Sequence, residues 1–385
     1  MPIYLDHAAT SPMPAFVASA YLEALQVVGN PASIHSQGQN AKRMLEEARE
    51  RVAASLGADS VEVTFTGGGT EAVNLAIKGL WWSREGRNRI LVPEGEHHAT
   101  IDAVEWLATQ GAVIDWVPID ANGRIDLEVL AAKLGPDVAL VTAIWANNEV
   151  GTIEPVREIA ALAAAHGVPV HLDAIAAYGY VPIDFHALGV AALSVSAHKI
   201  GGPVGIGALL IARSATVVPL LHGGNQQRAR SGTQDAAGAV AFGVAASALD
   251  IAGHAARLSV LRDRLVAGIR SAVPSAVYRG DPIDRLPGNA HFTFPGCEGD
   301  SLLFLLDVAG FSVSTGSACQ AGVPEASHVL LSMGLSEADA RGALRFTLGP
   351  TTTQAEVDAL VAALPDAVAR ASRAGLADRE TTLGR

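Results

Sequence analysis

Short apolar runs alternate with stretches of helical periodicity between about residues 62 and 212. Several of these runs are apolar at every position, which is typical of strands that helices cover on both faces. The stretches 99–111 and 155–167 carry apolar residues at helical spacing and end on glycine, as helices often do. The alternation predicts a doubly wound, mainly parallel α/β sheet. The predicted strands are VTF at 63–65, RILV at 89–92, VALVTAI at 138–144, PVHLDA at 169–174, LSVSA at 193–197 and IGALLIA at 206–212.

The pattern changes after about residue 235. An Ala-rich stretch from Asp235 to about Val273 predicts a helical connection to a second unit. We expect that unit to be a small α+β domain, which the N-terminal residues join. Its predicted elements are strands at 290–294 and 345–348 and helices at 299–308 and from about 353. The expected domains are a large one, 16–254, and a small one, 1–15 together with 255–385.

The composition fits a compact globular protein. Of the 385 residues, 49% are hydrophobic and 17% are charged, the opposite of a disordered chain. The net charge of −12 and the lack of Lys and Arg clusters exclude a nucleic-acid-binding surface. No apolar run approaches the ~20 residues of a membrane span, and there is no leader pattern, so we expect a cytoplasmic protein. Two cysteines are too few for a disulfide framework.

A lysine stands at a strand end in the segment SVSAHKIGGPVGIG. Lys199 has small neighbours and few carboxylates near it in sequence, so its amine can lose a proton and form a Schiff base. An isolated lysine is more often a solvated surface residue. Asp173 changes that balance, because it ends a strand 26 residues earlier. Pyridoxal phosphate (PLP) needs a carboxylate at its ring nitrogen and a lysine at its aldehyde, so the pair predicts a PLP site.

The segment FTGGGTEAVNLA supplies a candidate phosphate site. It has a strand, a glycine turn and a helix that begins near Gly69 and Thr70, whose main-chain amides and hydroxyl can bind an anion. Glycine turns before helices are common, so the segment alone is weak evidence. Together with Lys199 and Asp173 it favours PLP, and Ser196 and His198 are further candidate phosphate donors.

Ten motifs give the chain a specific resemblance. It resembles the cysteine desulfurases of the NifS/IscS type, within the class V aminotransferase group, over essentially its whole length. The resemblance implies a PLP-dependent transferase of fold type I that takes sulfur from L-cysteine and leaves L-alanine. The sulfur stays on an enzyme cysteine as a persulfide for a sulfur-acceptor protein, and iron–sulfur cluster assembly, tRNA thiolation and a biosynthetic pathway are open as its destination. The motifs are YLDHAAT, NPASIHSQG, FTGGGTEAVN, EHHA, NNEVGT, DAIAA, SAHKIGGP, RSGT, STGSAC and RFTLG.

The resemblance also implies roles for four further residues. His97 of EHHA would stack on the cofactor ring and move protons, and Asn147 of NNEVGT would contact the substrate or the cofactor oxygen. Arg345 of RFTLG would pair with the substrate carboxylate, for which its planar fork is suited. Thr233 of RSGT would reach the phosphate in a neighbouring subunit, which implies a homodimer with shared sites.

The two cysteines have different surroundings. Cys319 lies in a segment rich in Gly, Ser and Ala, STGSACQAG, which suits an accessible nucleophile better than a core cysteine. Its thiolate would attack the sulfur of the bound substrate. Cys297, near a strand end in FPGCEGD, is better interpreted as structural. No Cys and His cluster has metal-ligand spacing, so we expect no metal.

Three positions depart from the pattern of the family that the chain resembles. Ala176 stands where that family usually has Gln, the loop GGNQQRARSGT is one residue shorter, and Val204 replaces a frequent Lys. The leading prediction is a cysteine desulfurase that uses Lys199, His97 and Cys319. The alternatives are a related PLP-dependent carbon–sulfur lyase or other class V enzyme, and a catalytically impaired binding partner of sulfur-carrier machinery.

Overall fold

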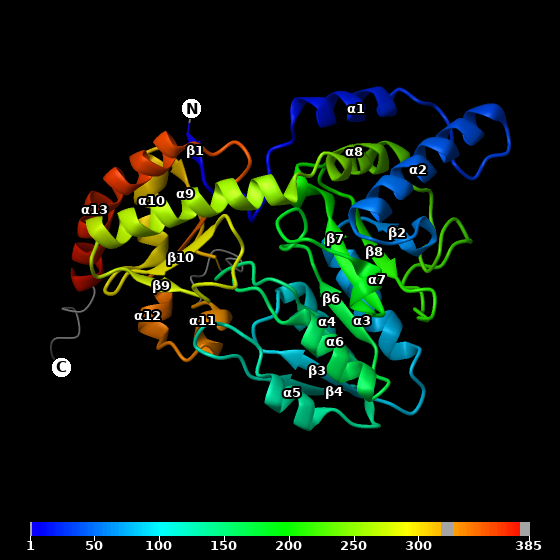
Figure 1. Cartoon of the computed structure of the whole chain (residues 1–385), viewed down its shortest axis with the longest axis horizontal. Coiled ribbons are helices and arrows are strands. Elements are labelled where there is room, and N and C mark those ends of the chain that lie inside the picture. The colour runs from blue at the N-terminus through cyan, green and yellow to red at the C-terminus, as the bar shows by residue number, and fades with distance from the viewer. Residues whose placement is uncertain (1, 317–325, 378–385) are drawn as a thin grey trace.

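A seven-stranded sheet forms the centre of the larger part of the molecule (Figure 1). The structure is a computed structural model that describes residues 2–316 and 326–377. The strands lie in the order β2-β8-β7-β6-β5-β3-β4, and only β8 runs antiparallel to its neighbours. The predicted α/β sheet is therefore confirmed. The strands are β2 (Val63–Thr66), β3 (Arg89–Pro93), β4 (Val113–Val117), β5 (Val138–Ile144), β6 (Val170–Asp173), β7 (Ala192–Ser196) and β8 (Gly207–Ile211).

Helices cover both faces of this sheet, as its apolar strands require. In β8, Leu209 and Ile211 pack with the helices of one face, whereas Ala208 and Leu210 pack with those of the other. The first face carries α3 (Gly69–Trp82) and α4 (His98–Ala108). The second carries α2 (Ser36–Ser55), α5 (Leu127–Lys133), α6 (Val156–Ala165), α7 (Phe185–Leu188) and α8 (Ala236–Ser247), with α1 (Ala15–Leu25) packed on α8.

Two predictions about elements need correction. The sequence pattern missed β4, because three of its five residues are only half-buried and one is exposed, as an edge strand allows. The Ala-rich stretch expected as one helical connection is two helices, α8 and α9 (Ile251–Ala272), bent by 71°. Asp250 starts the second helix, because its side chain accepts a hydrogen bond from the Gly253 N–H.

Two small sheets, one of three strands and one of two, share a separate hydrophobic core in the smaller part of the molecule. Strand β10 pairs antiparallel with both β9 and β12, and the N-terminal strand β1 pairs parallel with β11. Phe292, Phe346 and Leu5 are fully buried in this core. The elements around this core are β1 (Ile3–Tyr4), β9 (Val277–Arg279), β10 (Asn289–Thr293), α10 (Gly299–Val308), β11 (Phe311–Ser312), β12 (Ala343–Thr347) and α13 (Gln354–Ala377). The short helices α11 (His328–Ser332) and α12 (Glu337–Arg341) instead pack against the core of the larger part.

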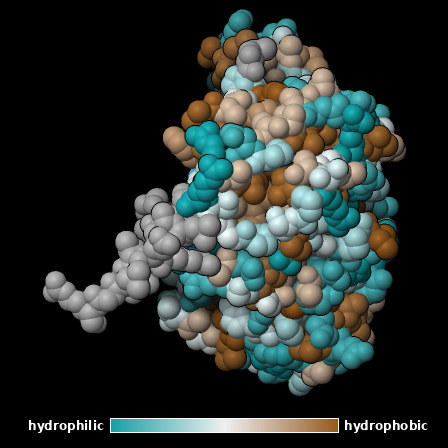
Figure 2. Space-filling model, turned by 90° about the vertical axis from the view of Figure 1, so that its left-hand side faces the viewer, coloured by the Kyte–Doolittle hydropathy of each residue, from teal (hydrophilic) through white to brown (hydrophobic). Residues whose placement is uncertain are grey.

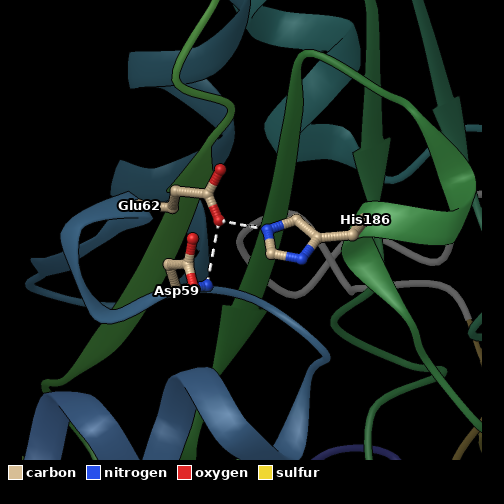
Figure 3. Close-up of side chains that lie close together, drawn as sticks. All are labelled: Asp59, Glu62 and His186. Atoms are coloured by element: carbon tan, nitrogen blue, oxygen red, sulfur yellow. Dashed lines mark hydrogen bonds and ion pairs between the residues drawn. The ribbon is translucent and has the colours of Figure 1, made fainter.

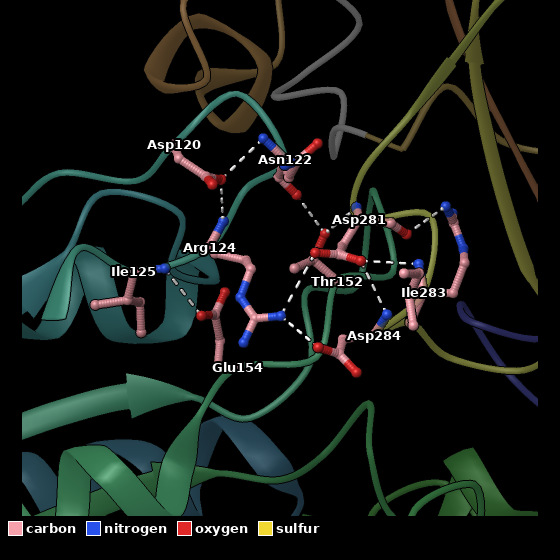
Figure 4. A network of polar contacts seen from close by, with 10 residues as sticks. Asp120, Asn122, Arg124, Ile125, Thr152, Glu154, Asp281, Ile283 and Asp284 are labelled. Carbon is pink, nitrogen blue, oxygen red and sulfur yellow. Dashed lines mark hydrogen bonds and ion pairs between the residues drawn. The ribbon is translucent and has the colours of Figure 1, made fainter.

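A polar network joins the two parts (Figure 4). The Arg124 guanidinium, in the loop after β4, pairs with the carboxylates of Asp281 and Asp284, in the loop after β9. Beside it, the buried Glu154 carboxyl accepts a hydrogen bond from the Ile125 N–H. Burial raises the pKa of Glu154 to about 8, against the opposing effects of that N–H and of Arg124.

One bent pair of helices is the only candidate for crossing a membrane among the described residues. In the described residues, no single helix is both long and apolar enough to cross a bilayer, and only α8 with α9 meets the criteria jointly, across their bend. Polar and apolar side chains are interspersed over the face drawn in Figure 2.

Ala229 is the one described non-glycine residue with a positive φ, 59°. It lies in the shortened loop, and its neighbours are fixed. The Gln227 side-chain amide pairs with the main chain of Phe65 in β2, and Arg228 donates hydrogen bonds to the carbonyls of Ile211, Ala212 and Ala215. These contacts hold the alanine in a conformation that favours glycine.

Replacing Ala229 with Gly should therefore raise the free energy of unfolding by about 0.5–1 kcal/mol, because relief of the left-handed strain exceeds the entropy cost. Chemical denaturation measures the change. The control Ala164→Gly, at an exposed position of α6, should lower stability by about 0.5–1 kcal/mol. An equal loss in both variants would contradict the strain.

Candidate active site

A cavity of about 370 Å³ opens at the carboxyl ends of the parallel strands. This is the edge at which open α/β sheets bind ligands. Asp173 ends β6, Ser196 ends β7, and Gly69 begins α3 after β2. The smaller part contributes Arg345 from β12, and the N-terminal segment contributes Ala8 and Ala9. The cavity is therefore built from both parts of the fold.

Lys199 lies in a short 3-10 helix, η2 (Ala197–Ile200), between β7 and β8. Its Nζ donates hydrogen bonds to the main-chain oxygens of Ala8 and Ala9. Burial lowers the pKa of Lys199 to about 8, and the positive charge of Arg345 lowers it further, while Asp173 and Asp6 oppose the shift. A large fraction of the amine is therefore neutral in mildly alkaline solution, as a nucleophile requires.

Asp173 presents a buried carboxyl group to the same cavity. It is 2% exposed, and its Oδ1 accepts a hydrogen bond of 2.9 Å from the Ile175 N–H. Burial raises its pKa to about 6, and the Ile175 N–H and Lys199 limit that rise. Within the described residues no cation forms an ion pair with it, so a protonated ring nitrogen fits here.

The turn before α3 fits a phosphate group. Gly68 has a φ of 147°, which favours glycine, and a Cβ at Gly69 would press on the end of the Ile175 side chain, so the turn leaves its main chain uncovered. Ser196 Oγ is buried without a hydrogen-bond partner among the described residues, as expected of a donor meant for a ligand. His198 also lines the cavity, and its Nδ1 is bonded to Thr10 Oγ1 at 2.9 Å. Thr70 lines the cavity as well.

His97 is the N-cap of α4. Its Nδ1 accepts a hydrogen bond of 3.0 Å from the Ala99 N–H, so the ring carries its proton on Nε2. Burial lowers its pKa to about 4, and Lys199, His98 and His328 lower it further. A neutral imidazole in the cavity wall can stack on an aromatic ring; that role for His97 stays a prediction.

The structure brings Asn148 to the cavity in place of Asn147. The Asn147 amide is buried in its own turn, where it donates to the Gly95 carbonyl and accepts from the N–H groups of Glu149 and Val150. Asn148 and Glu149 line the cavity. In a run of two asparagines the sequence gives no sign of which side chain closes the turn.

Arg345 reaches the cavity with a fixed guanidinium group. Its Nη2 pairs with Asp6 at 2.7 Å, its Nη1 donates to the Asn148 carbonyl, and its Nε has no hydrogen-bond partner in the described part of the chain. The contact with Asp6 was not foreseen from the sequence. The free Nε is consistent with a site for a ligand carboxylate.

Two of the residues considered in the sequence, Cys297 and Thr233, do not line the cavity. Cys319 lies outside the described residues, although Ser314 and Gly316 before it line the cavity. Cys297 is 3% exposed and packs in the core of the smaller part, which supports its structural interpretation. Thr233 is exposed and does not line this cavity. Its loop is nevertheless tied to the phosphate turn, because Arg230 pairs with Glu71 of α3 at 3.0 Å.

Sequence reasoning missed Glu96 and His328, which also line the cavity. The His328 ring packs edge-on against His98, with centroids 4.9 Å apart, and its Nε2 donates to the Glu96 carbonyl at 2.8 Å. Only the EHHA motif pointed toward this region, and nothing in the sequence connected His328 to it.

One group of carboxylates and histidine lies close enough to hold a metal ion in the described chain (Figure 3). It consists of Asp59, Glu62 and His186. The Glu62 carboxylate already has hydrogen-bond partners within the protein, because its Oε2 accepts from both His186 Nε2 and the Asp59 N–H. The bond from the Asp59 N–H is one half of a capping box at the start of a 3-10 turn, η1 (Ser60–Glu62); in the other half the Asp59 side chain accepts from the main chain of Glu62.

Comparisons with known proteins agree with this geometry. Residues 3–360 match the family described as Aminotransferase class-V. An IscS-like cysteine desulfurase of Mycobacterium tuberculosis is 52% identical, over 97% of this chain and 98% of that protein. The cysteine desulfurase NifS of Azotobacter vinelandii is 39% identical, over 96% and 93%.

Solved structures give the same result. A NifS-like protein superimposes with a TM-score of 0.90 at 32% identity, covering 96% of this chain and 100% of its own. A protein described as SspA in complex with cysteine gives a TM-score of 0.81 at 31% identity, with coverage of 91% and 100%. The chain therefore belongs to the class-V aminotransferase family, among the cysteine desulfurases of the IscS/NifS type.

Proposed function

We propose that the cavity around Lys199 binds PLP and that the protein uses it to take sulfur from L-cysteine. One observation supports this most strongly: a desolvated amine and a buried carboxylate without an ion-pair partner, Lys199 and Asp173, face one cavity. Lys199 would hold the cofactor aldehyde, Asp173 the ring nitrogen, and Gly69, Thr70, Ser196 and His198 the phosphate. PLP supplies an electron sink that stabilises negative charge at the substrate carbon.

The chain's own groups would do the rest. Arg345, fixed by Asp6, would bind the substrate carboxylate, with Asn148 beside it rather than Asn147. Lys199, once free as an amine, would move the proton at the substrate carbon, and His97 would stack on the ring and assist. The Cys319 sulfur would form a bond to the substrate sulfur as the carbon–sulfur bond breaks. L-Cysteine and the thiol would thus become L-alanine and a persulfide.

Further features belong to this proposal. The exposed Thr233 would reach the phosphate of a second copy, giving a homodimer with shared sites, and a sulfur-acceptor protein would collect the persulfide. The chain would divide into a large domain, 16–254, and a small one, 1–15 with 255–385, in keeping with its separate cores. A cytoplasmic location stays a prediction.

Ala176 keeps a carbon–sulfur lyase as the second candidate. It lines both the main cavity and a small adjoining one, so an alanine methyl group stands where the family usually has a glutamine amide. A wall altered in this way can redirect the chemistry without loss of the cofactor.

Incubation of the PLP-loaded protein with L-cysteine distinguishes the candidates. We expect equimolar L-alanine and a persulfide on Cys319, measured by amino-acid analysis and mass spectrometry of the peptide. Cys319→Ala should lose both, because no thiol accepts the sulfur. Cys297→Ala, which changes the buried cysteine, should keep both. Sulfide release that survives Cys319→Ala would establish the lyase instead.

The adjacent asparagines give a second prediction. Asn148→Ala should lower kcat/KM for L-cysteine at least ~10-fold with little change in stability, because Asn148 lines the cavity. Asn147→Ala should instead lower the free energy of unfolding by about 1–3 kcal/mol, because it leaves buried main-chain groups unpaired. Steady-state kinetics and denaturation measure the two effects. The reverse pattern would restore Asn147 to the site.

A further inference from the structure

Glu96 is a buried acid at the floor of the cavity that the proposed chemistry does not use. It lies in the loop between β3 and α4 and is 1% exposed. Its Oε1 accepts a hydrogen bond of 2.6 Å from the N–H of Ile144, the last residue of β5. Its main-chain oxygen accepts the bond from His328 Nε2. Glu96 thus connects the end of β5 with α11.

The second oxygen of this carboxyl group has no such contact. Glu96 Oε2 is buried without a hydrogen bond of normal length among the described residues. The buried Thr100 hydroxyl is a neighbouring donor, and its interaction with the carboxyl group favours the charged form without outweighing burial. A carboxylate oxygen left without a donor in a dry site is costly, whereas a protonated oxygen carries no net charge.

Asp173 is the acidic residue whose charge acts most strongly on Glu96. Ile144, which Glu96 contacts, is the register partner of Asp173 on the adjacent strand β6, so the two carboxyl groups share one floor of the cavity. Two buried acids so placed cannot both ionise cheaply. The other ionisable groups that act on Glu96 or line its cavity are Glu154 and Glu149 after β5, Lys199 and His198 of η2, Arg345 of β12, His97 and His98 at the start of α4, and His328 of α11.

We propose that Glu96 is a positioning residue that stays a neutral acid near neutral pH, so that it adds no second negative charge beside Asp173. The neutral group keeps the Ile144 N–H satisfied and adds no charge. Asp173 can then ionise and hold a cationic ring nitrogen, as PLP requires. This inference rests on the proposed function for its cofactor, but its first test needs none.

The electrostatics agree with the geometry. Burial raises the pKa of Glu96 to about 8. The Ile144 N–H and the Thr100 hydroxyl oppose the rise, whereas the charges of Asp173 and, more weakly, Glu154 add to it. In the unfolded chain the group ionises near its ordinary pKa of 4.5. The folded protein therefore binds one more proton between these values, and its stability falls as pH rises from about 4.5 to about 8.

Glu96→Gln tests this in the apo-protein. The amide is isosteric and neutral at every pH, so the variant does not lose stability with rising pH as wild type does when Glu96 ionises. Its melting temperature minus that of wild type should increase from pH 5 to pH 8 and level off above. Glu154→Gln is the matched control, because Glu154 is as deeply buried, has a similarly raised pKa and does not line the cavity. It should give a similar curve. A flat curve for Glu96→Gln would overturn the neutral acid.

The affinity for PLP separates positioning from a merely structural role. A cationic ring nitrogen at Asp173 favours ionisation of Glu96, so by linkage the wild-type affinity gains with pH relative to Glu96→Gln. The dissociation constant of Glu96→Gln divided by that of wild type should be near one at pH 6.5 and about five by pH 9. Lys199 titrates in both proteins, so its effect on the affinity for PLP cancels in this ratio. Glu154→Gln should show little change.

The outcomes can be told apart. A ratio that does not vary with pH would mean that Glu96 is structural only, and this would overturn the positioning role. Failure of wild type to bind PLP would instead refute the proposed function and leave the apo-protein result intact. If Glu96→Gln does not fold, infrared spectra of Glu154→Gln decide: a protonated carboxyl band lost between pH 7 and pH 9 supports the proposal, and its absence overturns it.

Discussion

Exclusion of water from the carboxyl edge of the seven-stranded sheet is the constraint on which the site depends. It is the largest cause of the shift in every ionisable group that matters: the pKa of Lys199 falls to about 8, that of His97 falls to about 4, and that of Asp173 rises to about 6. Each shift disfavours charge. The cavity therefore offers a reactive amine and a neutral ring, and it retains one carboxylate for a cationic ligand group.

The same dry edge is assembled from segments far apart in the chain. Main-chain oxygens of Ala8 and Ala9, just after β1 of the smaller part, hold the Lys199 amine of the larger one. Asp6 of that N-terminal segment fixes Arg345. The Arg124 network joins the loops of the two parts (Figure 4). The site is complete only when the two cores pack together, so interface stability and chemistry are coupled.

Sequence patterns predicted what depends on strand ends and missed what depends on tertiary contacts. Lys199 and Asp173 could be predicted because one apolar strand ends at Asp173 and another ends at Ser196, shortly before Lys199. Asn148 could not be separated from Asn147, because adjacent residues of one turn face different groups and their register is set by the Gly95 carbonyl. Glu96 acquires its meaning only from Ile144 and Asp173, on two other strands. The half-exposed strand β4 lacked the apolar pattern altogether.

Lys199 is the residue on which the proposed PLP site depends most. The PLP-loaded protein can be reduced with borohydride, which fixes a lysine-bound PLP, and then digested and analysed by mass spectrometry of its peptides. We expect one modified peptide, with the added mass on Lys199, and no fixed cofactor in Lys199→Ala. A modification on another lysine, or an unmodified protein after loading, would contradict it.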